Sequence, residues 1–294
     1  MDPESISIRA NAEDPAAQYL LGEMYLSGNG VEKNILETTK WWSRAAHHGH
    51  VQAQYDLGSL YSKGNGVKQD YATAVKWWTK AAEQGNINAQ YDLGIYYCIG
   101  KGVQHKDEQA SKLFAMGEGR PLDYSLAAKW WGKAADQDHT PSQFNLGTLY
   151  FNGTGVSRDF AKAADLWTQA AEKGYAEAQY NLGDMYARGF GRKQNYETAT
   201  SWWEKAAMQG HCRAQFLLSQ MYFIGKGVDH DIIAAYAWVN HAVKDGESEI
   251  VAWRNSMSES LTRDQILESK KLYLEILKNM SSKGNEQEKQ VHSP

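Results

Sequence analysis

The chain has 294 residues, of which 42% are apolar and 12% aromatic, and it contains 11 tryptophans and 17 tyrosines. This composition predicts a folded protein and excludes an intrinsically disordered one. The net charge of −4, from 31 basic and 35 acidic residues, gives no excess of basic surface for nucleic acid binding. No apolar run reaches the roughly 18 residues of a membrane span, so we expect no membrane insertion.

The amino-terminal stretch lacks the basic and apolar segments of a secretory signal peptide. The expected location is therefore cytoplasmic, with a periplasmic or secreted location as the alternative if a leader has been removed. Residues 4–12 are predicted to form a short helix before Asp14 and Pro15. Such a helix would cap the first end of a stacked fold.

Residues 15–246 are built from one unit that recurs about every 36 residues. Each unit begins with a helical segment in which small and apolar residues, such as Ala53, Leu57 and Leu60, follow the 3.6-residue period. A period of this length is typical of solenoids, in which one helix pair stacks on the next. The first-helix matches are AQYLLG (17–22), AQYDLG (53–58 and 89–94), SQFNLG (142–147), AQYNLG (178–183) and AQFLLS (214–219).

A second helix follows in each unit after a Gly-x-Gly turn. In the second unit, Gly64 and Gly66 end the first helix, and Asp70 stands where it can cap the second helix. The second helix carries a Trp pair, here Trp77 and Trp78, followed by two alanines. Ten of the eleven tryptophans occupy this paired position, which favours packing within and between repeats over ligand stacking.

The regular spacing is broken once, because Ala89 and Ser142 lie 53 residues apart instead of 36. An insertion of 17 residues would explain the difference. The alternative that we favour is a fusion of two incomplete repeats, which makes 103–122 an irregular unit. This alternative predicts a short helix at 106–116 that bulges from the loop edge or offsets the stack.

The carboxyl-terminal part departs from the repeat. Residues 247–280 are predicted to form two capping helices, the second beginning after Thr262, so that about six to seven repeats and their caps form one solenoid over residues 1–280. Residues 281–294 are polar and are predicted to be a disordered tail.

The pattern A-x-x-x-L-G-x-x-Y-x-x-G-x-G-V followed by D-Y-x-x-A-x-x-W-W-x-K-A-A-x-x-G resembles the Sel-1-like repeat, a relative of the tetratricopeptide repeat. The resemblance covers roughly residues 5–280. It implies an all-α fold, a right-handed solenoid superhelix of antiparallel helix pairs. It also implies a bacterial adaptor or scaffold without enzymatic activity that binds a protein or peptide.

Motifs that carry chemistry are weak in this sequence. The Gly-x-Gly turns follow helices and not strands, so they do not fit a nucleotide-binding loop. His47, His48 and His50 cluster without a nearby cysteine or carboxylate, and we favour helix-end roles over a metal site. We expect no cofactor, no metal and no catalytic residues, although a hydrolase or a metal-dependent enzyme with a pocket inside the superhelix remains an alternative.

A partner is expected to bind in the concave groove lined by the first helices, by likeness to tetratricopeptide arrays. Positions there that differ between repeats are candidates for recognition, because the repeated positions form the core. Simple solvent exposure explains the polar ones equally well, and the two phenylalanines could instead fill gaps between repeats. A secreted binder of host or immune proteins is an alternative function, and a monomer is the expected state. The candidate residues are Asp56, Asp92, Asn145, Asn181, Phe151 and Phe223.

Overall fold

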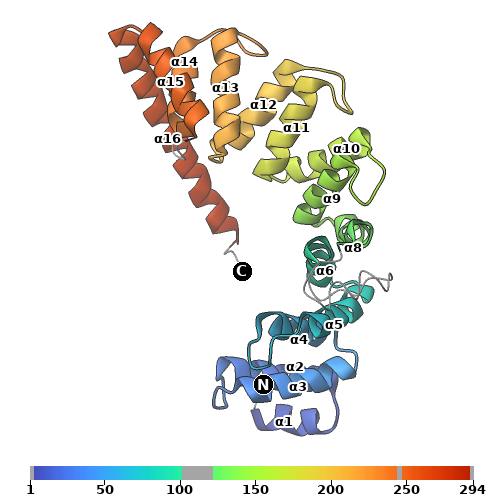
Figure 1. The fold of residues 1–294 in the computed structure, drawn as a ribbon. Coiled ribbons are helices and arrows are strands. Elements are labelled where there is room, and N and C mark those ends of the chain that lie inside the picture. The colour runs from blue at the N-terminus through green and yellow to red at the C-terminus, as the bar shows by residue number, and fades with distance from the viewer. Residues whose placement is uncertain (1–2, 101–121, 244–246, 292–294) are drawn as a thin grey trace. The chain divides into compact units, whose positions relative to one another are not determined.

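The structure of the protein, a computed structural model, describes residues 3–100, 122–243 and 247–291 (Figure 1). Within these ranges the regular elements are helices and no strand occurs, so the fold is an all-α solenoid of helix pairs, as predicted. The helices form two compact units, Met1–Arg158 and Asp159–Pro294, and each is described on its own. The predicted irregular unit at 103–122 and its short helix at 106–116 fall almost wholly outside the described residues.

The first unit begins with α1 and continues with helix pairs. We call the first helix of each repeat the A helix and the second the B helix. The first unit consists of α1 (Pro3–Asn11), the A helices α2 (Pro15–Ser27), α4 (Val51–Lys63), α6 (Ile87–Ile99) and α9 (Thr140–Asn152), and the B helices α3 (Ile35–His47), α5 (Tyr71–Glu83) and α8 (Tyr124–Asp136).

The second unit begins with a B helix and ends with two helices outside the repeat pattern. Its B helices are α10 (Phe160–Glu172), α12 (Tyr196–Met208) and α14 (Ile232–Ala242). Its A helices are α11 (Ala176–Arg188) and α13 (Cys212–Ile224), and the last two helices are α15 (Ser248–Ser260) and α16 (Arg263–Val291).

Local sequence explains where the helices begin and end. Asp70 caps α5 by accepting hydrogen bonds from the backbone N–H groups of Ala72 and Thr73. Gly64 ends α4 in the left-handed conformation, with a φ of 71°, that glycine adopts without strain. The other B helices have the same kind of cap in an Asn or Asp residue: Asn34, Asp123, Asp159, Asn195 and Asp231.

The two tryptophans of a pair have different packing partners. Trp78 lies against the A helix of its own repeat, where its Nε1 donates to the backbone oxygen of Tyr55 at 3.1 Å. A Cβ on Gly58 would come within 2.6 Å of the Trp78 ring, so glycine is needed for this close approach. Trp77 instead packs in a cluster with Ala45 of the preceding B helix α3. The first tryptophan therefore joins neighbouring repeats, and the second closes its own repeat.

A pair of regular helices, α6 and α8, flanks the irregular stretch of the sequence. Trp131 of α8 donates to the backbone oxygen of Tyr91 in α6 at 3.2 Å, and its ring lies over Gly94. These are the contacts that α5 makes with α4. The helices on both sides of residues 101–121 thus pack as the A and B helices of one ordinary repeat.

A ladder of buried glutamines, one per A helix, joins the repeats. Gln54 is 3% exposed; its amide donates to the backbone oxygen of Ala46 at 3.0 Å, and its Oε1 accepts from Gln84 at 2.7 Å. Gln179 repeats this arrangement with Ala171 and Gln209. Gln54 and Gln179 thus tie the end of the preceding B helix to the end of their own B helix.

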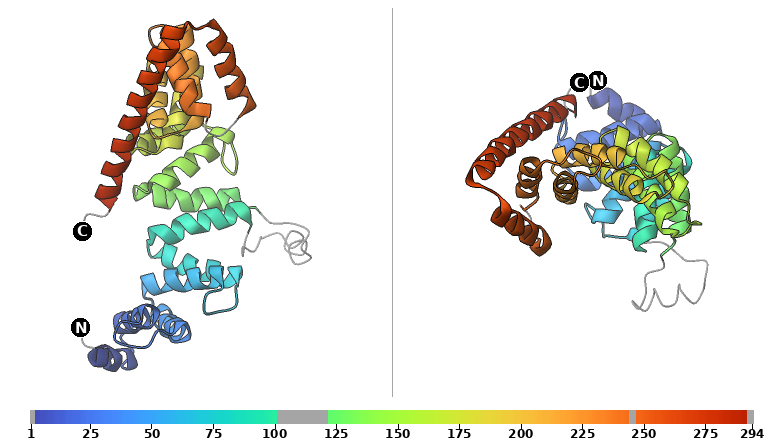
Figure 2. Two further views of the ribbon diagram at one scale, coloured as in Figure 1. Left: turned by 90° about the vertical axis from the view of Figure 1, so that its left-hand side faces the viewer. Right: turned by 90° about the horizontal axis from the view of Figure 1, so that it is seen from above.

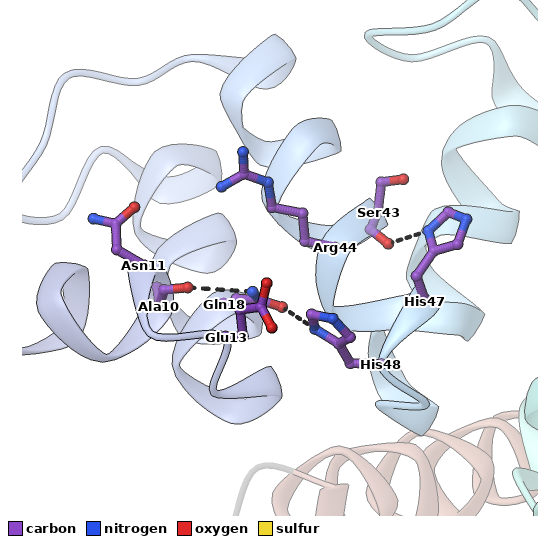
Figure 3. A pocket seen from close by; sticks show the side chains of 8 residues that line it. All are labelled: Ala10, Asn11, Glu13, Gln18, Ser43, Arg44, His47 and His48. Carbon is purple, nitrogen blue, oxygen red and sulfur yellow. Dashed lines mark hydrogen bonds between the residues drawn. The ribbon is translucent and has the colours of Figure 1, made fainter.

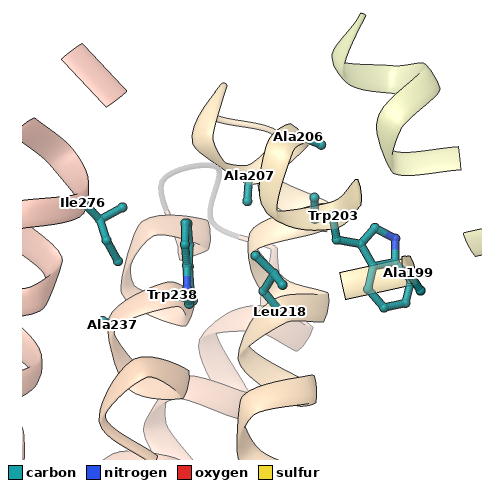
Figure 4. Close-up of a cluster of buried hydrophobic side chains, with 9 residues drawn as sticks. Ala199, Trp203, Ala206, Ala207, Leu218, Ala237, Trp238 and Ile276 are labelled. Carbon is teal, nitrogen blue, oxygen red and sulfur yellow. The ribbon is translucent and has the colours of Figure 1, made fainter. Parts of the chain in front are cut away.

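Helices at the two ends cover the terminal repeats. Trp41 packs against Ile6 and Ala10 of α1. At the other end, Trp238 of α14 lies between Ile276 of α16 and the A helix α13 (Figure 4). Helix α16 runs beside α14 in all views (Figures 1 and 2).

The last helix differs from the predicted end of the fold. Thr262 begins α16 as a capping box, in which its hydroxyl accepts from the Gln265 N–H and the Gln265 side chain accepts from the Thr262 N–H. The helix then continues to Val291, where the sequence predicted disorder from residue 281. Lys, Glu and Gln are good helix formers and are frequent in this stretch, so the polar composition there does not oppose a helix.

Candidate functional site

The candidate site is the face of the A helices that points away from the core. In α4 the buried residues, including Ala53 and Leu57, lie on one side of the helix, and the residues on the other side are half-buried. All six predicted residues are half-buried. In the first unit this surface, which we call the acidic A-face, comprises Tyr19, Glu23, Tyr55, Asp56, Ser59, Tyr91 and Asp92.

Asp56 is held by the repeat that precedes it. The Tyr19 hydroxyl donates to its Oδ2 at 2.9 Å, and the Gln52 amide reaches both carboxylate oxygens at 3.1 Å. Burial raises the pKa of Asp56 despite these hydrogen bonds. Glu23 is nearby, and burial together with the charge of Asp56 raises the pKa of its carboxyl group. Two carboxylates therefore share a half-buried location around one tyrosine hydroxyl.

Asp92 occupies the same position one unit further along the chain. Burial raises the pKa of Asp92, and interactions with the Tyr55 hydroxyl and with the charge of Lys63 oppose this shift. Burial and the carboxylate of Asp92 raise the pKa of Tyr55 to about 12. Within the described part of the chain, neither Asp56 nor Asp92 has a Lys or Arg within ion-pair distance. The acidic A-face thus holds half-buried negative charge without a direct cationic partner.

The second unit has the same helices but compensated charges. Burial raises the pKa of Asp184 on α11, while Arg188 one turn later forms an ion pair with it at 3.2 Å and opposes that shift. Arg213 on α13 forms ion pairs with Glu247 and Glu249. Asn181 occupies the position that Asp56 and Asp92 occupy in the first unit.

The structure does not bring the other predicted residues together as one site. Phe223 packs edge-on against Trp253 at 5.1 Å and belongs to the core cluster beneath α15. It fills a gap at the end of the second unit, which was one of the two roles open for it. Phe151 and Asn145 lie on α9 in the first unit, and both are half-buried. The sequence analysis did not select Glu23, Tyr19 or Tyr55, which lie beside the aspartates of the acidic A-face.

The histidines at positions 47, 48 and 50 make different contacts, and Figure 3 shows His47 and His48 bonded to different partners. His47 bonds the backbone oxygen of Ser43, whereas His48 bonds the side chain of Gln18. His50 caps α4 and stacks on Tyr19 with ring centroids 4.6 Å apart. No group of three potential metal ligands occurs among the described residues. The histidines are thus used to end one helix and begin the next.

A cavity of about 440 Å³ opens between α1 and the end of α3 (Figure 3). It is lined by Gln18, Arg44, His48 and Glu13, among others. Gln18 and His48 are already bonded to each other across it, at 3.0 Å. The cavity mixes cationic, anionic and neutral groups and does not converge on one chemistry. Within the described residues, no helix is long and apolar enough to cross a membrane.

Comparison with known proteins agrees with the repeat geometry. The sequence profile of the Sel1 repeat matches seven times, at 15–50, 51–86, 87–116, 110–139, 140–175, 176–211 and 212–245. The matches at 87–116 and 110–139 overlap, and together they cover the irregular stretch. The overlap falls on residues 110–116, and the fusion of two incomplete repeats stays a prediction. Comparison with curated proteins produced no match.

Two solved structures illustrate the likeness. A Sel1 repeat protein from Oxalobacter formigenes is 31% identical, with 80% of this chain and 87% of that chain covered and a TM-score of 0.58. The protein c5321 of uropathogenic Escherichia coli, described as a protective antigen with an SLR fold, is 27% identical. That alignment covers 97% of this chain and 72% of the other, with a TM-score of 0.42. With seven profile matches over residues 15–245, the chain belongs to the Sel1 repeat family.

Proposed function

We propose that this protein is a non-enzymatic scaffold that binds an extended segment of a partner protein along its A-helix faces. Sel1 repeat proteins are generally protein-interaction scaffolds, which supports the general class. The specific proposal rests on how the repeats differ. Framework positions such as Gly58 and Trp78 recur, whereas Asp56, Asp92, Asn145 and Asn181 vary at one position on the A helices.

The observation that carries the proposal is the half-buried negative charge of the acidic A-face, on which Lys63 and His50 act only through space, at Asp92 and Asp56 respectively. Half-buried carboxylates at Glu23, Asp56 and Asp92 are partly desolvated and have no described Lys or Arg in direct contact. A basic side chain of a partner would supply the missing charge at low desolvation cost to the scaffold. Tyr19 and Tyr55 would add aromatic surface beside that cation. Asn145 in the first unit and Asn181 in the second would each offer amide donors and acceptors to the partner.

Site-specific photocrosslinking tests this placement. A photoreactive residue at Ser59, on the A-face, should capture the partner in the cells that produce the protein. The same residue at Ala72, which is exposed on a B helix, is the matched control and should capture much less. Replacing Asn145 and Asn181 with tryptophan, or Asp56 and Asp92 with asparagine, should reduce capture at Ser59 without unfolding the chain. Equal capture from Ser59 and Ala72 would reject the A-face as the binding site.

A further inference from the structure

A second charged surface lies on the B helices of the first unit. Each of these three helices carries two cations spaced four residues apart around the Trp pair, in the sequences KWWSR, KWWTK and KWWGK. All six cations are exposed. We call this set the basic stripe, and it consists of Lys40, Arg44, Lys76, Lys80, Lys129 and Lys133.

Contacts with the tryptophans order five of the six cations of the stripe, three of them at less than 5 Å from a ring centre. Arg44 lies over the ring of Trp41 at 4.7 Å, and Lys80 lies over Trp77 at 4.7 Å. Lys133 lies 4.8 Å from the ring centre of Trp130. These indoles are at most 7% exposed, so the cations sit at the edges of buried rings. Cation–π contact limits their movement and reduces the entropy that binding would remove.

Packing between repeats makes the stripe continuous over three helices. Trp77 of α5 packs on α3, and Trp130 of α8 packs against Val75 and Trp78 of α5. The equivalent positions in the second unit are Asp165 and Gln169, Ser201 and Lys205, and Ala237 and His241. The paired cations are therefore a property of the first unit and not of the repeat framework, which both units share.

We propose that the basic stripe binds an acidic segment of a protein, in which carboxylates recur about every third or fourth residue. Neighbouring B helices meet through the Trp77 and Trp130 side chains and not backbone to backbone, so they lie farther apart than the about 8–10 Å of directly packed helices. Three to four residues of extended polyproline-type chain span about 9–12 Å, so carboxylates at this spacing can meet successive helices. This surface is separate from the acidic A-face, and the inference does not depend on the proposed function.

Carboxylates interspersed with the cations favour a peptide over a uniform polyanion. Glu83 and Asp136 are exposed on α5 and α8, and Glu37 forms an ion pair with Lys40 at 3.0 Å. A nucleic acid or an anionic membrane would bring negative charge against these carboxylates as well as against the cations. A peptide can place neutral residues opposite them, and so it keeps the attraction without the repulsion.

Fluorescence anisotropy with the full-length protein tests the proposal. The probe is a labelled peptide of about 12 residues with glutamate at every third position between serine and glycine, a length that crosses three helices. The wild type should bind it, and binding should weaken as salt is added. The variant K76Q/K80Q/K129Q/K133Q should lose about tenfold in affinity, from four exposed charge pairs.

Three controls make the result specific. K33Q/K63Q/K68Q/K193Q removes the same charge at four other exposed lysines and should change the affinity less than about twofold. Arginine at the four stripe lysines should retain binding, which separates charge from damage to folding. Absence of binding by the wild type, or an equal loss in the lysine control, would overturn the proposal. So would tighter binding of a single-stranded oligonucleotide or of phosphatidylserine vesicles than of the peptide at the same salt.

Discussion

The two units share one internal framework and differ in their surfaces. In both, the second tryptophan of a pair donates to a tyrosine backbone oxygen of its own A helix: Trp78 to Tyr55 and Trp203 to Tyr180. On the outside, the first unit has an acidic A-face and a basic stripe, whereas the second unit pairs Asp184 with Arg188. We therefore expect stability to depend on the repeated positions, and we propose that recognition depends on the diverged ones.

The largest expected effect concerns the shared framework. Trp78→Ala and Trp203→Ala each remove an indole that is no more than 3% exposed, together with its hydrogen bond. Each should lower the free energy of unfolding by about 3–5 kcal/mol, because a large cavity remains in the core. Urea unfolding with hydrogen exchange localised by mass spectrometry should show the loss first in the mutated unit.

The stricter part of this prediction is that Trp78→Ala and Trp203→Ala lower the free energy of unfolding by about the same amount. Leu36→Ala is the control, because Leu36 is 66% exposed and its truncation should change stability by less than about 0.5 kcal/mol. A melting profile for Trp78→Ala like that of the wild type would contradict the packing role that we assign to the Trp pair. A large effect in one unit with a small effect in the other would show that the frameworks differ despite their common contacts.

The buried glutamines give the next largest effect. Gln54→Leu removes the hydrogen bond that Gln54 donates to the Ala46 backbone oxygen and the one that it accepts from Gln84, and Gln179→Leu removes the equivalent bonds with Ala171 and Gln209. The two backbone oxygens still accept from the N–H groups of Gly49 and Gly174, so each substitution should cost about 1–2 kcal/mol in unfolding free energy, measured by denaturant titration. Gln220→Leu, on a half-buried part of α13, is the control and should change stability little.

The repeat framework could be predicted from the sequence because it depends on local periodicity. The helix pairs, the Asp70 cap and the packing of the Trp pair all follow from residue type and spacing. The glutamine ladder could have been found by the same reasoning, because Gln54 stands on the apolar side of its helix, next to Ala53. A polar residue at a core position must find hydrogen-bond partners.

The candidate site was less predictable, because it depends on contacts between repeats. The bond from Tyr19 to Asp56 joins residues 37 positions apart, and local periodicity does not specify which outer residues of neighbouring A helices meet. The sequence also leaves Phe223 open between an exposed anchor and a core residue. Its neighbour Trp253, whose contact fits the gap-filling role, comes from a helix outside the repeat pattern.

A smaller expected effect concerns two strained residues that occur in the first unit. Glu13 and Asp138 have positive φ angles of 64° and 69°, at the position that Gly49 and Gly85 occupy in other repeats. Glu13→Gly should raise the free energy of unfolding by about 0.5–1 kcal/mol, as relief of strain exceeds the added flexibility of the unfolded chain.

Asp138→Gly provides the matched comparison for Glu13→Gly. The Asp138 carboxylate accepts a hydrogen bond from the buried Gln143 amide at 3.1 Å, and glycine would lose this bond. The gain from relieved strain and the loss of about 1 kcal/mol for the bond should nearly cancel. Thermal unfolding of both variants measures the difference, and an equal gain in both would show that this bond contributes nothing.

The smallest effect tests the difference between the two surfaces directly. Asp56→Asn should stabilise the protein at pH 7 by a few tenths of a kcal/mol, because an amide can still accept from Tyr19 without carrying a half-buried charge. Asparagine already occupies the same repeat position at Asn145 and Asn181. Asp136→Asn, at an exposed carboxylate on α8, is the control and should leave stability nearly unchanged.

The pH dependence of this gain separates it from a simple packing change. Burial raises the pKa of Asp56 in the folded state, so the folded protein binds a proton more readily than the unfolded chain. The contribution of this group to stability therefore falls as pH rises from the ordinary carboxyl pKa through the raised one. The gain in unfolding free energy from Asp56→Asn should be full at pH 7. It should be absent below about pH 4, where the Asp56 carboxyl group of the wild type is protonated and as neutral as the asparagine amide. If the stability gain of Asp56→Asn persisted below about pH 4, it would not come from the removal of a half-buried charge. The negative charge of the acidic A-face would then not distinguish the first unit from the second.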